Sequence, residues 1–273
     1  MRWEREAEVS DGVRERPFRV QAYGRDVPGI LWLPAEGPGA ERPSQRGPGP
    51  ERPPERGPAR GTAPRPLVLL GHGATRHKRV DYLLALGRRL AGDHGFAVAA
   101  IDAPGHGDRR APGLHDDIKL FGAFLAEWSR EGSTDDMVAD WQATIEALRA
   151  LDEVGDGPIG YWGLSMGTIY GVPLVAAEPR IQVAVFGLMG LVGPTRERMA
   201  VDAGSLACPV LFVQQWDDAL IPRQHVFELF DAIGSVDKRL HAHPGDHAAV
   251  PIEEIVFSAQ FLVRHLAPHA GEA

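Results

Sequence analysis

The chain has 273 residues, 44% of them hydrophobic and 24% charged, a balance typical of a globular protein large enough for one α/β domain. Its formal net charge of −8 argues against a nucleic acid or an anionic membrane as the partner. The single cysteine, Cys208, excludes an intramolecular disulfide and a cysteine-based metal cluster. A charged N-terminus and the lack of a long apolar run favour a cytoplasmic protein without a membrane span.

The first elements expected along the chain are two short strands. Residues 17–23 and 27–33 are largely apolar and flank the turn signal Gly24-Arg25-Asp26, which predicts a β-hairpin. Residues 34–66 then change abruptly to Pro, Gly, Glu and Arg. Such a segment buries too little apolar surface to offset the entropy of ordering it. We interpret it as a flexible insertion in a surface loop, with a proline-rich protein ligand as the alternative.

Beyond the insertion, short apolar runs alternate with segments of helical periodicity. Because buried strands separated by helices are typical of parallel sheets, this alternation predicts an α/β fold. We expect a doubly wound, mostly parallel sheet of about eight strands, with helices on both faces and no large cap domain. Residues 1–273 then form a single domain. The further strands are expected at 67–70, 96–101, 158–162, 181–186, 209–213 and 238–242, and the helices at 77–91, 116–128, 134–151, 168–177, 223–233 and 251–266.

The pentapeptide Gly163-Leu164-Ser165-Met166-Gly167 lies between an expected strand and an expected helix. A serine on such a tight strand–turn–helix connection projects its hydroxyl above the sheet, and the flanking glycines remove side chains from the close backbone contacts. The same position places Ser165 at a helix N-terminus, where free amides can hold a developing oxyanion. The motif indicates a nucleophile, although the pentapeptide alone also matches ordinary turns.

Two further strands are followed by groups that a nucleophilic serine needs. Asp217 and Asp218 follow one of them, and His247 follows the last. Ligands of parallel sheets bind beyond the carboxyl ends of the strands, so these side chains are expected near the serine. An imidazole takes the serine proton and returns it to the leaving group, while a carboxylate orients the imidazole. The prediction is a catalytic set of Ser165, His247 and one of the two aspartates.

A second oxyanion donor is expected from the loop after strand 67–70. Its sequence, Gly71-His72-Gly73-Ala74, places the amide of Ala74 where it can pair with the amide of Met166. We interpret His72 as a structural residue that ties this loop by hydrogen bonds.

Three other histidines compete for roles with His247. His106 lies in a loop near the expected site and is interpreted as shaping that loop. His241 and His243 form a close pair on an expected strand, with no acidic ligand set nearby in the sequence, and are interpreted as structural. No metal and no cofactor are expected.

Four motifs occur in chain order: His72-Gly73, Asp102-x-Pro104-Gly105-His106-Gly107, Gly163-x-Ser165-x-Gly167, and Asp218-x-x-Ile221-Pro222 followed by Gly245-x-His247. Together they resemble the α/β-hydrolase superfamily, in its esterase/lipase and dienelactone-hydrolase-like branches. The resemblance covers most of residues 66–266 and the N-terminal hairpin, and the Pro-rich insertion departs from it. In the family the acid usually precedes a Val-Pro or Ile-Pro pair by two residues, which selects Asp218 over Asp217. A serine at the strand–turn–helix connection argues against membership in the branches of the family that use an Asp or Cys nucleophile.

The resemblance implies a serine hydrolase that cleaves carboxylic esters, with small or short acyl groups, through a seryl acyl-enzyme. An acyltransferase, a thioesterase or an amidase can use the same triad, and a non-catalytic binding protein of this fold is a further alternative. The partner is then a small-molecule ester, and the chain a monomer or homodimer. Residues 107–134 supply apolar side chains, including Phe121, Phe124 and Trp128, that we expect to roof a substrate pocket; ordinary helix packing is the alternative.

Overall fold

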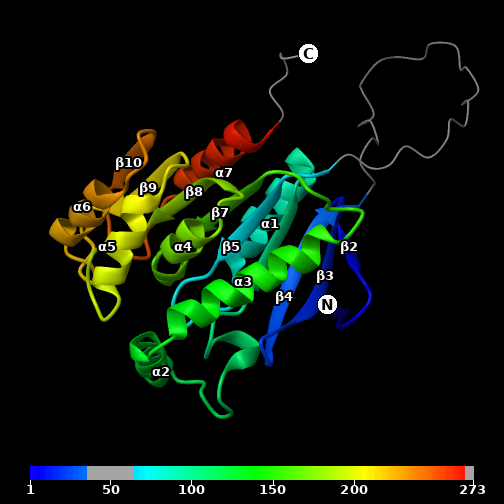
Figure 1. Cartoon of the computed structure of the whole chain (residues 1–273), viewed down its shortest axis with the longest axis horizontal. Helices are drawn as coiled ribbons and strands as arrows, with labels where there is room; N and C mark the ends of the chain where they lie inside the picture. The colour runs from blue at the N-terminus through cyan, green and yellow to red at the C-terminus, as the bar shows by residue number, and fades with distance from the viewer. Residues whose placement is uncertain (36–63, 268–273) are drawn as a thin grey trace, which may run out of the picture.

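The computed structural model describes residues 1–35 and 64–267, so the insertion predicted at 34–66 lies almost entirely outside the described residues. Within these ranges ten strands form one sheet in the order β1-β3-β4-β6-β5-β7-β8-β9-β10, and β2 pairs with β3 (Figure 1). The strands are β1 (Arg2–Trp3), β2 (Glu8–Ser10), β3 (Val13–Ala22), β4 (Arg25–Pro34), β5 (Leu67–Gly71), β6 (Ala97–Ile101), β7 (Ile159–Gly163), β8 (Ile181–Gly187), β9 (Val210–Gln215) and β10 (Lys238–His243).

The sheet is mostly parallel, as the sequence predicts. Strands β5 to β10 all pair in parallel. The β3–β4 hairpin is antiparallel and joins the sheet through β6. Every residue of β5, β6, β7 and β9 is buried, which explains why these strands are mostly apolar; Gln214 and Gln215 at the end of β9 are the polar exceptions among them. The two strands beyond the predicted eight are β1 and β2, which have two and three residues and carry no apolar run.

Helices cover both faces of the sheet. One face packs against α1 and α7, and the other against α3, α4, α5 and α6 (Figure 1). Each face has its own cluster of buried apolar side chains. No helix among residues 1–35 and 64–267 is both long and apolar enough to cross a membrane. The helices are α1 (Asp81–His94), a 3₁₀ turn η1 (Gly107–Arg109), α2 (Asp117–Ser129), α3 (Ser133–Arg149), α4 (Met166–Ala177), α5 (Arg196–Ser205), α6 (Arg223–Ala232) and α7 (Ile252–Leu266).

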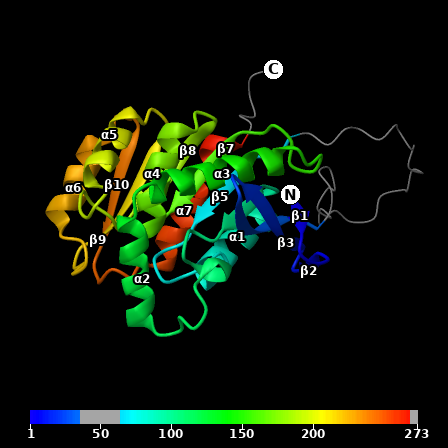
Figure 2. The ribbon, with the colours of Figure 1, turned by 60° about the horizontal axis from the view of Figure 1, so that its bottom comes forward.

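Helix α2 lies across the edge where the parallel strands end, and Figure 2 shows it projecting beyond the sheet. Phe124 contacts His106, which follows β6, with ring centroids 6.0 Å apart. Trp128 donates a 2.8 Å hydrogen bond to Thr195 Oγ1, which follows β8. Between β8 and β9 only the ten-residue helix α5 intervenes. Among the described residues, the helix added at this edge is therefore α2, whereas α5 packs against α4 and α6 on the sheet face.

Candidate active site

Ser165 occupies a sharp turn between β7 and α4. Its φ of 57° is in the left-handed region that side chains rarely adopt, and it is the N-cap residue of α4. The surrounding backbone holds this strained conformation: Ser165 N donates to Gly187 O at 2.9 Å, and Ser165 O accepts from Thr168 N at 2.8 Å. Because Met166 is the first helical residue, its amide has no carbonyl acceptor one turn earlier within the helix. The turn thus presents a half-buried hydroxyl beside a free helix N-terminus.

The glycines of the pentapeptide are explained by the buried Tyr161 side chain and by the backbone of the neighbouring strand β5. Its hydroxyl donates to Gly167 O at 2.6 Å, and burial raises its pKa. A Cβ atom at Gly163 would lie 2.6 Å from the Tyr161 hydroxyl, and one at Gly71 would lie 2.2 Å from it. A Cβ at Gly167 would lie 2.8 Å from Gly71 O on the neighbouring strand β5. Close packing therefore requires glycine at these positions, and this packing fixes the turn.

His247 lies between Ser165 and Asp218. Its Nε2 is 3.0 Å from Ser165 Oγ, and its Nδ1 is 2.7 Å from Asp218 Oδ2. Since an ionised carboxylate only accepts hydrogen bonds, Nδ1 carries the proton and Nε2 presents its lone pair to the serine hydroxyl. The Asp218 side chain is 1% exposed, and its other oxygen accepts from Leu220 N at 2.8 Å and Ile221 N at 3.0 Å. The structure thus brings the three predicted residues into one hydrogen-bonded chain.

Asp217 takes no part in the hydrogen bonds that link Ser165, His247 and Asp218. It fastens the loop that carries His247. Its Oδ2 accepts a 3.0 Å hydrogen bond from Gly245 N, and the residue is exposed. Gln215, at the end of β9, holds the same loop from its other side. Its amide donates to Pro244 O at 3.3 Å and to Ala249 O at 2.8 Å. The loop that carries His247 is therefore positioned mainly by polar contacts.

The loop expected to supply the second oxyanion donor begins at the end of β5. His72 Nδ1 is 2.9 Å from Gly73 O, and its Nε2 accepts from Ala103 N at 3.0 Å. Burial and the neighbouring His106 lower the pKa of His72 to about 3. His72 is therefore neutral at physiological pH and acts as a hydrogen-bonded tie, in line with its interpretation from the sequence. Ala74 follows in a turn and is half-buried.

His106 is also held within a loop, in agreement with its predicted role. It is 3% exposed, and its Nδ1 is 2.8 Å from Pro104 O. Burial lowers its pKa.

A buried ion pair beside the loop was not apparent from the sequence. Asp102 is fully buried at the end of β6 and accepts from Lys78 N at 2.8 Å and Lys78 Nζ at 2.7 Å. Lys78 Nζ also donates to Asp108 at 2.7 Å. Burial alone would raise the pKa of Asp102, but the charge and hydrogen bonds of Lys78 outweigh it and lower that pKa. These partners lie 24 and 30 residues from Lys78, so no local pattern joins them.

The three side chains predicted to roof a pocket differ in exposure. Phe124 and Trp128 are 5% and 8% exposed, stack on each other at 5.6 Å, and belong to the core of this sheet face. Phe121 is 44% exposed and contacts Phe124 at 5.8 Å. Packing thus accounts for two of the three, and Phe121 is the one whose ring lies open to solvent.

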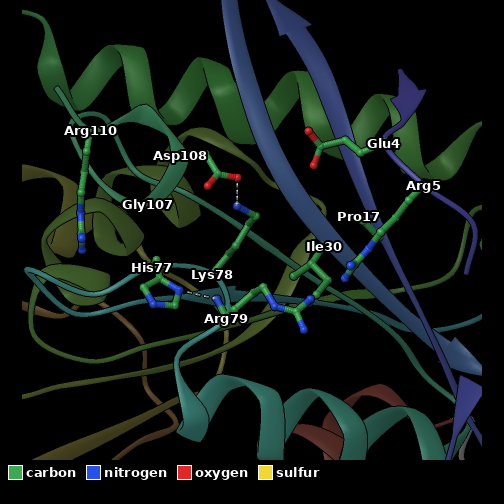
Figure 3. A pocket seen from close by; sticks show the side chains of 10 residues that line it. All are labelled: Glu4, Arg5, Pro17, Ile30, His77, Lys78, Arg79, Gly107, Asp108 and Arg110. Atoms are coloured by element: carbon green, nitrogen blue, oxygen red, sulfur yellow. Dashed lines mark hydrogen bonds and ion pairs between the residues drawn. The ribbon is translucent and has the colours of Figure 1, made fainter. Parts of the chain in front are cut away.

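A cavity of about 540 Å³ opens between the N-terminal hairpin and the segments that follow β5 and β6 (Figure 3). Its lining includes none of Ser165, Asp218 and His247, so its size does not mark the place of the chemistry. Figure 3 shows Lys78 bonded to Asp108 along its wall. Its side chains that can carry positive charge are Arg5, His77, Lys78, Arg79 and Arg110.

The structure corrects one expectation about His241 and His243. An acidic group does accompany them, because Glu254 from α7 lies against both rings. The sequence offered no signal for this contact, since Glu254 is an ordinary acidic residue in the first turn of a helix.

Comparisons with known proteins agree with this architecture. A family model described as serine aminopeptidase, S33 (Hydrolase_4) matches residues 62–197, which include the Ser165 turn but not Asp218 or His247. The comparison with curated proteins gives no match.

Three solved structures extend the similarity over nearly the whole chain. A cold-adapted esterase from an Arctic intertidal metagenomic library, bound to polyethylene glycol, is 37% identical, with a TM-score of 0.80, and the alignment covers 97% of this chain and 100% of that one. A zinc-bound structure of a cold-adapted esterase from such a library is 35% identical, with a TM-score of 0.75 and the same coverage. A protein provisionally described as a dienelactone hydrolase, from Klebsiella pneumoniae, shares the fold at 19% identity and a TM-score of 0.68, covering 94% and 99%.

The first two structures are similar enough over their full length to establish the family. The mostly parallel sheet, the serine on a strained turn after β7 and the order Ser165, Asp218, His247 are those of the superfamily that the motifs resemble. The chain therefore belongs to the α/β-hydrolase superfamily of serine hydrolases and is an esterase-type member of it.

Proposed function

We propose that this enzyme hydrolyses carboxylic esters of small or short acyl groups through a seryl intermediate. In this proposal Ser165 is the nucleophile, His247 the general base and Asp218 the carboxylate that orients it. The observation that carries the proposal is the unbroken chain of contacts, 3.0 Å from Ser165 Oγ to His247 Nε2 and 2.7 Å from His247 Nδ1 to Asp218 Oδ2. His247 is 82 positions from Ser165 and 29 from Asp218 in the sequence, yet the three side chains meet in the geometry that proton transfer requires.

Acylation begins when Ser165 Oγ attacks the ester carbonyl carbon and passes its proton to His247 Nε2. The carbonyl oxygen becomes an oxyanion, which in this proposal accepts hydrogen bonds from the amides of Met166 and Ala74. Asp218 stabilises the imidazolium formed in this step. When the tetrahedral intermediate collapses, the bond to the alcohol oxygen breaks and His247 returns the proton to that oxygen. The alcohol leaves, and the acyl group remains on Ser165.

Deacylation repeats these steps with water in place of the serine hydroxyl. His247 removes a proton from a water molecule as the water oxygen attacks the acyl carbon. The second tetrahedral intermediate then releases Ser165 Oγ, which recovers its proton from His247. The products are a carboxylic acid and the free enzyme.

The preference for short acyl groups is supported by the structure around the serine. Among the described residues only α5 separates β8 from β9, a connection too short for a cap domain. Phe124 and Trp128 are engaged in core packing, which leaves Phe121 as the exposed aromatic on α2. Besides Phe121, only Ile118 and Leu125 are large apolar side chains exposed on α2 among the described residues. Without a cap domain to cover it, a long acyl chain loses much of the roughly 0.8 kcal/mol that each buried methylene gains.

A panel of p-nitrophenyl esters from acetate to palmitate tests the proposal on the wild type and on Ser165→Ala. We expect the highest kcat/KM on the shortest esters and loss of activity in Ser165→Ala. Ser205→Ala is the matched control, because this exposed serine donates to Asp202 O at 2.7 Å in α5, far along the chain from Ser165. It should retain wild-type activity.

Two results would contradict the proposal. Activity retained by Ser165→Ala would contradict the assignment of Ser165 as the nucleophile. The highest kcat/KM on palmitate would contradict the preference for short acyl groups. Because the matching family model is described as an aminopeptidase, amino-acid p-nitroanilides belong in the panel. Turnover of these amides without turnover of any ester would replace ester hydrolysis with amide hydrolysis on the same serine.

A further inference from the structure

A second group of histidines and a carboxylate lies where β10 meets α7. His241 and His243 alternate with Ala242 on β10, so both rings leave the same face of the strand. That face meets the first turn of α7, where Glu254 is buried. Its Oε2 is 2.9 Å from His241 Nδ1 and 2.7 Å from His243 Nε2. Three potential ligand atoms thus lie within 4.8 Å of one another.

The hydrogen bonding of Glu254 is incomplete. The residue is 3% exposed, yet its second oxygen, Oε1, is buried without a hydrogen-bond partner in the described part of the chain. Buried carboxylates are normally fully bonded or paired with a cation, because desolvation without compensation is unfavourable. The oxygens of Asp218, by contrast, accept two backbone amides and one imidazole. The carboxylate of Glu254 therefore has room for one more positive partner.

We propose that His241, His243 and Glu254 bind a divalent transition-metal ion, Zn²⁺ in the first instance, with a fourth position left to water. Two imidazole nitrogens and one carboxylate oxygen are a ligand set that suits Zn²⁺. When the ion binds, each neutral imidazole carries its proton on the ring nitrogen that does not face the carboxylate, and side-chain rotation brings the ligand atoms to about 2.0–2.2 Å from the ion. The side chains of His241 and His243 are 28% and 25% exposed, so the ion can enter from solvent.

The position of this site gives the metal a defined structural effect. His243 is the last residue of β10, and Glu254 lies in the first turn of α7. The loop between them carries His247. A metal bound by all three ligands therefore closes this loop at both ends and restricts the motion of the catalytic base. His241 is held for this role by Phe257, whose ring centroid lies 4.5 Å from its own.

Calorimetric titration of the tag-free, chelator-treated enzyme with ZnCl₂ tests the site. We expect one Zn²⁺ per chain with a Kd in the micromolar range or tighter, and a Tm that rises with zinc concentration. Glu254→Gln and His243→Gln each remove a ligand and should weaken binding by more than the ~10–100-fold that an outer-shell change causes. His225→Gln is the matched control. His225 contacts Glu228 at 3.0 Å, a pair that forms no three-ligand group among residues 1–35 and 64–267, so its loss should leave binding unchanged.

Anomalous diffraction at the zinc edge, from wild-type crystals soaked in zinc, locates the ion without any variant. The expected result is a peak between the three side chains. No binding by the wild type, peaks only at other places, or an unchanged Kd in Glu254→Gln would each overturn the proposal. Binding, Tm and diffraction are all measured without a substrate, so the outcome is independent of the proposed ester hydrolysis.

Discussion

The two halves of the proposed active site are held in different ways. On one side, the Ser165 turn is fixed by backbone packed directly on backbone, around the buried ring of Tyr161. On the other side, the loop with His247 lies at the edge strand β10 and is fastened by side chains, among them Gln215 and Asp217. The nucleophile therefore depends on packing, and the base on hydrogen bonds.

This difference predicts separable effects of mutation. Changes near Ser165 should act mainly on stability, because close-packed backbone cannot adjust without shifting β5 and β7. Changes in the contacts of the histidine loop should act mainly on kcat, since the loop can move while the fold persists. The following experiments test this separation, from the largest expected effect to the smallest.

The largest effect is expected on the polar side, at Asp218. Asp218→Asn removes the carboxylate that keeps the proton on His247 Nδ1, so the wrong tautomer faces the serine. We expect kcat to fall by about 10³–10⁴-fold, with little change in Tm. Asp217→Asn is the control: its side chain still accepts from Gly245 N, and kcat should change by less than about tenfold. Equal losses in the two variants would contradict the assignment of Asp218.

Gly167→Ala tests the packed side. The added Cβ would approach Gly71 O at 2.8 Å, a backbone atom that cannot move away alone. We expect the free energy of unfolding to fall by about 1–3 kcal/mol, measured in urea. Gly122→Ala is the control, because a Cβ there meets nothing within 4 Å on helix α2. Alanine's helix propensity should then stabilise the protein by up to ~1 kcal/mol. A stable Gly167→Ala would refute the packing argument.

The buried His72 makes the stability of the fold depend on pH. Its pKa is lowered to about 3 by burial and by His106, whereas the unfolded chain binds the proton near pH 6.5. Between these values the unfolded state binds more protons, so stability is full above the upper value and falls as the pH is lowered. The free energy of unfolding, measured in urea at about pH 7, 5.5 and 4.5, gives a slope against pH. His72→Gln should reduce this slope by about 1.4 kcal/mol per pH unit. Exposed His115→Gln should leave the slope unchanged, and equal slopes in all three proteins would contradict this role.

The smallest effect is expected at Gln215. Gln215→Leu removes the hydrogen bonds to Pro244 O and Ala249 O, which hold the histidine loop. We expect kcat to fall by about tenfold and the free energy of unfolding to change by less than about 1.5 kcal/mol. Gln214→Leu, whose amide bonds only to Gln215 O at 2.9 Å, is the control and should keep its kcat. A large loss of stability without loss of kcat in Gln215→Leu would contradict the expectation that contacts of the His247 loop act mainly on kcat.

Much of the fold was predictable because most of the parallel strands are buried on both faces and appear as apolar runs. The turn at Ser165 was predictable because its close contacts require glycine at positions 163 and 167, which flank the serine in the sequence. The prediction of Asp218 over Asp217 rested on the following Ile-Pro pair, and only Asp218 contacts His247. Strands β1 and β2 were not predictable, because they are short and depend on the neighbouring strand β3.

Other contacts escaped prediction for a different reason. The pairing of Lys78 with Asp102 and that of His243 with Glu254 depend on how loops and helices dock, which local patterns do not encode. Helix α2 shows the same limit. The sequence shows that this segment carries apolar side chains such as Phe121 and Phe124, but it does not distinguish a side chain that packs into the core from one that faces solvent.

The packing around Tyr161 constrains how this enzyme can diverge. A Cβ at Gly71 meets the tyrosine hydroxyl at 2.2 Å, whereas one at Gly171 meets the ring carbon Cε1 at the same distance. Replacement of Tyr161 by Phe therefore removes the severe contact at Gly71 and leaves Cζ at 3.1 Å, whereas the contact at Gly171 stays, so the order of substitutions matters. We therefore expect substitutions around this ring to be epistatic, and a randomised library to tolerate changes on the exposed face of α2 more readily than beside the nucleophile.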